Sequence, residues 1–295
     1  MNLLFRNMLS PGDLLMLTIA IRDLHYTYPN QFHVKIESSY PEIFYNNPYL
    51  KQWLDNSVFL EIIDLDYRDV FMRKNITGEH FSSGFIECIN KKLNLEIKKT
   101  TPFPDIFLTE KEKSNDILSR LGIEKPFWIF NAGFKNDMPL KAYPPDRWIK
   151  VIDSLSKKGI QLIQTGHSYH IHPTFNNIKS LIGETDNLRD YFSLMNHAEG
   201  AIGAISLQTH VAAAFNKPCV VIAGGREQAS WVSYNGQVFL SSVGFLDCCK
   251  VNGCWKKQKY DCKHLTKTKM TQPQCMNLIQ PEEIINAVLK YEGLK

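Results

Sequence analysis

Five of the chain's seven cysteines lie in one short segment: Cys248, Cys249, Cys254, Cys262 and Cys275. Thiolates gathered in this way are good ligands for zinc or iron, because four sulfurs held by short loops satisfy a tetrahedral ion. The spacing lacks the paired Cys-x-x-Cys of a zinc ribbon, so it does not identify the metal. A structural iron or zinc site is the favoured interpretation. Reduced structural thiols and disulfides are the alternatives, and either Cys248 or Cys249 could be the first ligand.

The expected cellular compartment argues against the disulfide alternative. The first residues show no cationic leader, no long apolar core and no cleavage site, which predicts a cytoplasmic protein with reduced cysteines. No run of about 18 apolar residues occurs, so no membrane span is expected. The two outlying cysteines, Cys88 and Cys219, are most simply small buried hydrophobic residues.

Four polar or glycine-rich loops follow apolar runs that are typical of buried strands. In an open α/β sheet, ligands bind outside the carboxyl ends of the strands, so these loops matter more than the helices. Helix N-termini and glycine turns also present backbone N–H groups to an anion. The candidate residues for binding a phosphate-containing ligand are Lys141 in the loop 131–141, Thr165 and Gly166, Ser206, Leu207, Gln208 and His210, and Gly224, Gly225, Arg226 and Glu227.

Each loop taken alone has a plainer interpretation. A Gly-Gly turn is more often only a turn, and every α/β domain contains helix N-termini. His210 by itself is more typical of a packed helix. Asp13, near the N-terminus, is more typical of a helix cap than of a catalytic base. Only the order of these features along the chain points to a function.

The elements that would position these loops alternate as strands and helices. Apolar periodicity predicts strands at 3–5, 33–37, 58–63, 127–130, 160–163, 200–205 and 219–223, and helices at 14–24, 80–93, 146–158, 188–197, 208–215 and 281–291. Such alternation predicts an α/β fold with parallel sheets. The length of 295 residues and the proline-containing segment 98–105, interpreted as a linker, predict two domains, 1–115 and 116–295.

The order of the motifs resembles glycosyltransferase family 9, the ADP-heptose:lipopolysaccharide heptosyltransferase family. Ser10-Pro11-Gly12-Asp13, followed by Tyr28-Pro29, is similar to the family's opening Gly-Asp motif. In the second half, Lys141-Ala142-Tyr143-Pro144 stands where the family has Lys-x-Trp-Pro. The stretch from Gly203 to Pro218 resembles the family's Asp-Ser/Thr-Gly-x-x-His-x-Ala-Ala segment.

The resemblance implies two Rossmann-like domains of the GT-B type. It makes 1–115 an acceptor domain and 116–295 a nucleotide-sugar-binding domain with the Cys-rich segment 248–275. It implies Asp13 as the general base, the neighbouring Gly12 as a donor-binding residue, and Lys141 as a phosphate contact. The implied partners are a nucleotide-diphosphate sugar of the ADP-heptose type and a glycan, lipopolysaccharide or protein acceptor, with no cofactor for catalysis. Some members hold iron with cysteines, which supports the metal interpretation of the cluster.

Two departures from the family pattern lie in the diphosphate-binding segment. Ile205 stands where the family has aspartate, and Leu207 stands where it has glycine. These changes leave open a non-catalytic protein that binds a sugar nucleotide or a glycan on the same scaffold. The basic run 256–269 leaves open, more weakly, a nucleic-acid glycosyltransferase. The sequence does not determine the base, the sugar, the acceptor or the oligomeric state.

Overall fold

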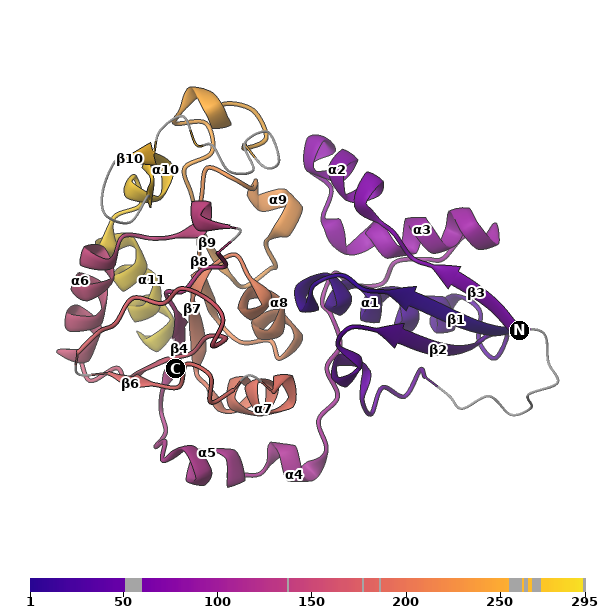
Figure 1. The fold of residues 1–295 in the computed structure, drawn as a ribbon, viewed down its shortest axis with the longest axis horizontal. Helices are drawn as coiled ribbons and strands as arrows, with labels where there is room; N and C mark the ends of the chain where they lie inside the picture. Colours follow the sequence, from indigo (N-terminus) through magenta and orange to yellow (C-terminus); the bar gives the residue numbers. More distant parts are fainter. Residues whose placement is uncertain are drawn as a thin grey trace. The chain divides into compact units, whose positions relative to one another are not determined.

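The computed structural model describes residues 1–50, 60–136, 138–176, 178–185, 187–254, 262, 265–266 and 272–293. The chain divides into two compact units, Met1–Lys111 and Glu112–Lys295. Each unit is built around its own parallel sheet, as Figure 1 shows. The predicted α/β class with two parallel-sheet domains is therefore confirmed. Among the described residues, no helix is long and apolar enough to cross a membrane.

The first unit contains a three-stranded parallel sheet of order β2-β1-β3. The central strand is buried through Leu3 and Phe5, and the apolar residues of the first helix are fully buried beneath it. The elements of this unit are β1 (Asn2–Asn7), α1 (Pro11–Thr27), β2 (His33–Ser38), η1 (Pro41–Phe44), β3 (Leu60–Asp64), α2 (Arg68–Thr77), η2 (Phe81–Ser83) and α3 (Gly84–Leu93), with α4 (Glu110–Lys113) at its boundary.

Two expectations for this unit need correction. Helix α1 begins at Pro11, three residues before the predicted start at residue 14, because proline at the first helical position has a backbone angle suited to a helix and lacks the N–H that would be unpaired there. The segment 98–105 is not a free linker. Arg22 of α1 donates to the carbonyl oxygens of Thr101 and Phe103 and to both carboxylate oxygens of Asp105, at 2.9–3.0 Å. Segment 98–105 is therefore part of the first unit.

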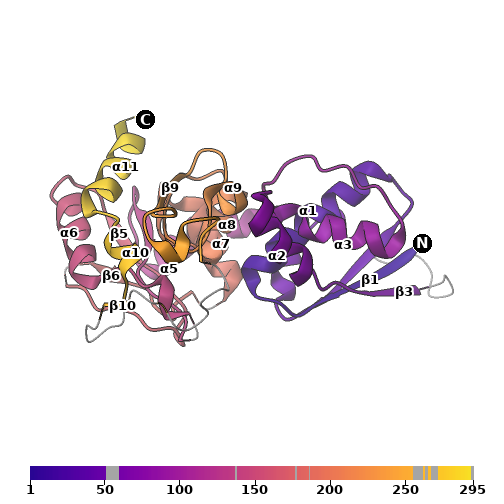
Figure 2. The same ribbon diagram turned by 90° about the horizontal axis from the view of Figure 1, so that it is seen from above.

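The second unit contains a six-stranded parallel sheet of order β6-β5-β4-β7-β8-β9. Helices α6 and α11 cover one face and α7 and α8 the other, as the two views in Figures 1 and 2 show. The strands are β4 (Trp128–Asn131), β5 (Leu162–Gln164), β6 (Lys179–Ser180), β7 (Gly200–Ala204), β8 (Cys219–Gly224) and β9 (Val238–Ser241). The helices are α5 (Asp116–Leu121), η3 (Pro139–Lys141), α6 (Pro145–Ser156), α7 (Leu188–His197), α8 (Leu207–Ala214), α9 (Ala229–Val232), η4 (Asp247–Cys249), α10 (Gln274–Asn277) and α11 (Pro281–Gly293). A two-stranded antiparallel pair joins β10 (Leu265–Thr266) to β11 (Gln272–Pro273).

Strand order changes direction once in each sheet. In the first unit the chain passes from β1 to β2 and then returns to the other side of β1 with β3. In the second unit it runs outward through β4, β5 and β6 and then returns to place β7 beside β4. Such reversal points open a crevice outside the carboxyl ends of the two adjacent strands, where α/β proteins bind ligands. Ligand binding is therefore expected outside the carboxyl ends of β1 and β3 in the first unit and of β4 and β7 in the second.

Candidate functional site

Asp13 lies at the reversal point of the first sheet, in the first turn of α1 after strand β1. Ser10 Oγ donates a hydrogen bond of 2.6 Å to Asp13 Oδ2. The hydroxyl of Tyr67, from the loop after β3, donates to the other carboxylate oxygen, Oδ1. The side chain is half-buried. Both oxygens of Asp13 are thus oriented by donors, in an arrangement that a simple helix cap does not require.

Tyr67 is itself fixed by packing. Its side chain is buried, and its ring stacks on Phe85 with centroids 4.2 Å apart and planes 19° apart. A Cβ atom at Gly84 would lie 2.5 Å from the Tyr67 ring, so the absence of a side chain there lets the ring approach α3. Tyr67 was not identified from the sequence, since it lies 54 residues from Asp13 and follows no recognisable motif.

Lys141 lies at the reversal point of the second sheet. Its ammonium Nζ donates a 2.9 Å hydrogen bond to the carbonyl oxygen of Ile205, directly after β7, and lies 3.4 Å from Glu227 Oε1, in the loop after β8. Burial lowers the pKa of Lys141, and the neighbouring Glu227 carboxylate raises it. The ends of three adjacent strands, β4, β7 and β8, therefore contribute to one cluster.

Arg226 adds a second cation to this cluster. Its side chain is only 2% exposed, and its Nε lies 3.9 Å from Glu227 Oε1. Nε and Nη1 have no hydrogen-bond partner within the described part of the chain. Buried guanidinium donors without acceptors are costly, and a planar fork of donors matches the oxygens of a phosphate or carboxylate. We therefore define the anion cluster as Lys141, Ser206, Arg226 and Glu227.

The start of α8 completes the anion cluster. Ser206 is the N-cap residue of α8 and forms a capping box with Thr209, and its buried hydroxyl has no hydrogen-bond acceptor among the described residues. The positive end of a helix dipole at this position favours a negative group. Leu207 is half-buried, and Gln208 is buried with its side-chain Nε2 close to Gly203. The backbone therefore still presents an anion-binding helix start although Leu207 replaces a glycine.

Other predicted donor-binding residues lie further from this cluster. His210 is buried in α8, where its Nδ1 lies 2.9 Å from the hydroxyl of Tyr234, a contact that fits a packed helix histidine. Thr165 and Gly166 follow β5, one strand beyond β4 in the sheet. A Cβ atom on Gly166 would lie 2.0 Å from the ring of His172, so that ring covers the glycine.

The described cysteines of the clustered segment have free thiols, and Cys249, Cys254 and Cys275 lie beside the Gly224-Gly225 turn. Burial raises the pKa of Cys254 to about 12 and of Cys275 to about 11, and it also raises that of Cys248. Cys249 Sγ lies 3.5 Å from the carbonyl oxygen of Ser242 and 3.4 Å from that of Leu246, so its S–H can donate to either of them.

The described residues do not provide a complete set of metal ligands. Across the residues that the structure describes, no three His, Cys, Asp or Glu side chains are grouped so that they could hold a metal ion. The stretch 255–261, between Cys254 and Cys262, lies outside the described residues, as does most of the basic run 256–269. The metal site thus stays a prediction from the sequence.

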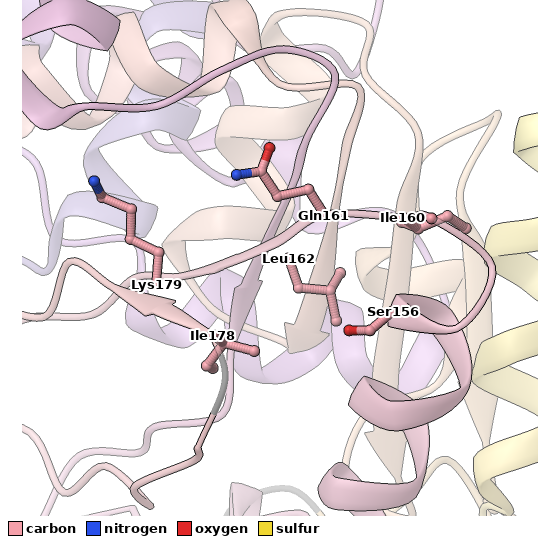
Figure 3. Close-up of a pocket in the computed structure, with 7 residues that line it drawn as sticks. Ser156, Ile160, Gln161, Leu162, Ile178 and Lys179 are labelled. Carbon is pink, nitrogen blue, oxygen red and sulfur yellow. The ribbon is translucent and has the colours of Figure 1, made fainter.

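A separate pocket of about 300 Å³ opens on the second unit, lined by Ser156, Gly159, Ile160, Gln161, Leu162, Ile178 and Lys179. Figure 3 shows these side chains around the start of β5 and the end of α6. This is the amino edge of the sheet, opposite to the anion cluster. Lys179 is held there by a 2.8 Å hydrogen bond to the Gly122 carbonyl oxygen. The pocket is therefore not part of the anion cluster.

Comparison with known proteins places these features in a family. The sequence profile of glycosyltransferase family 9 (heptosyltransferase) matches residues 72–259. No curated protein matched in sequence. The matched residues include the whole anion cluster and the first cysteines of the clustered segment.

Solved structures share the fold across the chain. ADP-heptose lipopolysaccharide heptosyltransferase II of E. coli superposes with a TM-score of 0.67 at 14% identity, covering 99% of this chain and 98% of its own. A family 9 glycosyltransferase of Veillonella parvula gives 0.66 at 14%, covering 98% and 96%. The iron-containing dodecameric glycosyltransferase TibC of enterotoxigenic E. coli gives 0.69 at 15%, covering 100% of this chain and 76% of its own. At 14–15% identity, these similarities show the fold alone: this chain has the GT-B fold of the heptosyltransferases.

Proposed function

This chain belongs to glycosyltransferase family 9, and from that membership we propose that it is an inverting glycosyltransferase that moves a heptose-like sugar from a nucleotide diphosphate to an acceptor hydroxyl. The observation that carries the proposal is the anion cluster. Lys141, Ser206 and Arg226 face the reversal point of the second sheet, and two of them have buried donors without acceptors among the described residues. A diphosphate would supply the missing acceptors.

The proposed reaction is a direct displacement. The acceptor oxygen forms a bond to the anomeric carbon while the bond from that carbon to the diphosphate oxygen breaks. The electron pair of the broken bond stays on the diphosphate, and the proton of the acceptor hydroxyl passes to Asp13. Ser10 and Tyr67 would hold the Asp13 carboxylate in one orientation for this transfer.

The second unit would stabilise the leaving group. Negative charge grows on the diphosphate in the transition state, and fixed cations and N–H groups that already point there lower its energy. Lys141 would contribute one ammonium donor, and Arg226 would contribute its free guanidinium edge. Glu227 keeps the two cations together. The helix start at Ser206 would add main-chain donors.

A donor and acceptor screen tests this function. The purified protein is incubated with ADP-heptose and with other nucleotide sugars, together with lipopolysaccharide core, glycan or peptide acceptors, and products are identified by mass spectrometry. We expect release of nucleoside diphosphate that depends on an acceptor. Tight binding of a nucleotide sugar without turnover would instead identify the chain as a non-catalytic binding protein. Transfer to a nucleic acid alone would support the weakest alternative.

Lys141→Ala should weaken binding of the nucleoside diphosphate by about 1.5–3 kcal/mol, the range for a charge-assisted hydrogen bond. Binding of the nucleoside without phosphates should stay unchanged, since the ammonium would not contact it. Isothermal titration with ADP and adenosine measures both. Lys158→Ala, which changes an exposed lysine at the end of α6, serves as the control. Equal losses for both ligands would mean that Lys141 only packs its loop.

We also propose a structural iron or zinc ion in the cysteine segment, with ligands among Cys248, Cys249, Cys254, Cys262 and Cys275. The proposal rests on the clustering of the cysteines in the sequence and on the position of Cys249, Cys254 and Cys275 beside one turn. Elemental analysis of protein purified without a metal-affinity tag should find about one metal per chain. Cys254→Ser should release the metal and lower the melting temperature, because metal binding contributes to folding free energy. Metal-free protein of unchanged stability would contradict the proposal.

A further inference from the structure

The turn Gly224-Gly225-Arg226-Glu227 joins two regions of the second unit. Its last two side chains belong to the anion cluster, where Glu227 lies 3.4 Å from the Lys141 ammonium. The backbone of its first three residues rests on the cysteine segment. We call the residues beneath it the cysteine seat, which comprises Cys249, Cys254 and Cys275. The sequence motifs of the donor site do not by themselves require a link between the anion cluster and the cysteine segment.

Hydrogen bonds fix the main chain of the turn. The Cys254 N–H donates to the Gly225 carbonyl oxygen at 3.0 Å, and the Ser242 N–H donates to the Gly224 carbonyl oxygen at 2.9 Å. Ser242 also binds the cysteine seat from the other side, since its Oγ donates to the Cys275 carbonyl oxygen at 2.8 Å. Its own carbonyl oxygen accepts from the Cys249 thiol. The turn and the cysteine seat therefore form one hydrogen-bonded unit.

The turn and the cysteine seat are also in close steric contact. A Cβ atom placed on Gly225 would lie 2.8 Å from Cys249 Sγ and 3.2 Å from Cys275 Cβ. The Cys249 side chain is fully buried. Because protein interiors are close-packed, it has little room to move away from an added methyl group. Gly225 has no left-handed backbone angle, so an alanine would be restricted by the cysteine seat rather than by its own backbone.

We propose that Cys249 and Cys275 are positioning residues of the donor site, which set the affinity for the diphosphate by holding the turn that carries Arg226 and Glu227. The proposal rests on the proposed function of the anion cluster. The thiols do not contact the ligand. They fix the position of the main chain of the turn. Only from that position can the Arg226 guanidinium reach the phosphate oxygens.

A double-mutant cycle on Gly225 and Cys249 tests the coupling, with ADP as the probe. Gly225→Ala should weaken ADP binding about tenfold or more, because the added methyl pushes the turn away from the cysteine seat. Cys249→Ala removes the sulfur nearest to that methyl. In the Gly225→Ala background it should therefore recover most of the lost affinity, which is the opposite of what two independent defects would do.

Two further measurements separate positioning from general damage to the fold. Cys219→Ala removes another buried thiol, at the opposite end of β8, and should leave the ADP dissociation constant within about twofold while lowering the melting temperature. In turnover assays Gly225→Ala should raise KM for the nucleotide sugar more than it lowers kcat, since Asp13 is untouched.

The outcomes are distinguishable. If wild-type protein binds neither ADP nor any other nucleoside diphosphate, the proposed function of the anion cluster is wrong and this proposal falls with it. Wild-type binding combined with an unaffected Gly225→Ala variant would overturn the coupling alone. So would a double mutant that binds ADP no better than Gly225→Ala.

Discussion

Asp13→Asn is expected to lower the rate of sugar transfer by about 10²–10⁴-fold, the usual contribution of a general base. The amide has the same shape as the carboxylate; its oxygen can accept from one of the two hydroxyls of Ser10 and Tyr67, and its NH2 group can donate to the oxygen of the other, so the local structure should persist. It cannot take up the proton of the acceptor hydroxyl. Donor affinity should change by less than about twofold, because the anion cluster belongs to the other compact unit.

Turnover with a saturating acceptor and titration with ADP measure the two quantities separately. Asp64→Asn is the matched control, since it neutralises an exposed carboxylate at the end of β3 in the same unit. Its transfer rate should equal that of the wild type. A variant of Asp13 that loses donor binding and turnover equally would identify this aspartate as a structural residue.

Arg22→Ala should destabilise the first unit by about 3–5 kcal/mol, the cost of breaking a buried ion pair from one side. Arg22 is 5% exposed and contacts the carboxylates of Asp23 and Asp105. Burial raises the pKa of Asp105, and the Arg22 guanidinium opposes that rise. Without the guanidinium, segment 98–105 loses the hydrogen bonds that Arg22 donates to it and keeps those to Thr18, Asp23 and Thr27 of α1.

Hydrogen exchange of the α1 amides in increasing urea reports the free energy of opening this unit without assuming two-state unfolding of the whole chain. Arg22→Lys should recover only part of the loss, because an ammonium cannot reproduce the planar fork. Arg6→Ala, which removes an exposed ion pair with Glu37, should lower the stability of the unit far less than Arg22→Ala does, because water and salt screen an exposed pair. If Arg22→Ala costs no more than this control, the buried network does not stabilise the unit.

Local patterns in the sequence were sufficient for the fold class and most strands and helices. Apolar runs such as 127–130 and 219–223 fall in strands that are buried on both faces, so their signal does not depend on distant partners. The short edge strand β6 was missed, because its two residues, Lys179 and Ser180, form no apolar run. Helix α2 was missed as well, since it is polar along most of its length.

The candidate site was predicted less completely, for a physical reason. Asp13, Lys141 and Ser206 were candidates from the sequence because each lies in a short motif after a strand. The contacts that orient them cross large sequence distances, as with Tyr67 on Asp13 and Glu227 beside Lys141. Local periodicity carries no information on such pairs. The dependence of the turn at Gly225 on cysteines further along the chain was invisible in the same way.

The bond from Lys141 to Ile205 bears on how this family can change during evolution. The acceptor is a main-chain oxygen, and the Ile205 side chain is buried in the apolar interior. Any amino acid at position 205 supplies the same carbonyl, while the acidic partner of the lysine comes from Glu227 on a neighbouring strand end. A lineage could therefore exchange the aspartate of the motif for an apolar residue and still keep its lysine anchored. Divergence in the letters of a motif then overstates divergence in the geometry that the motif encodes.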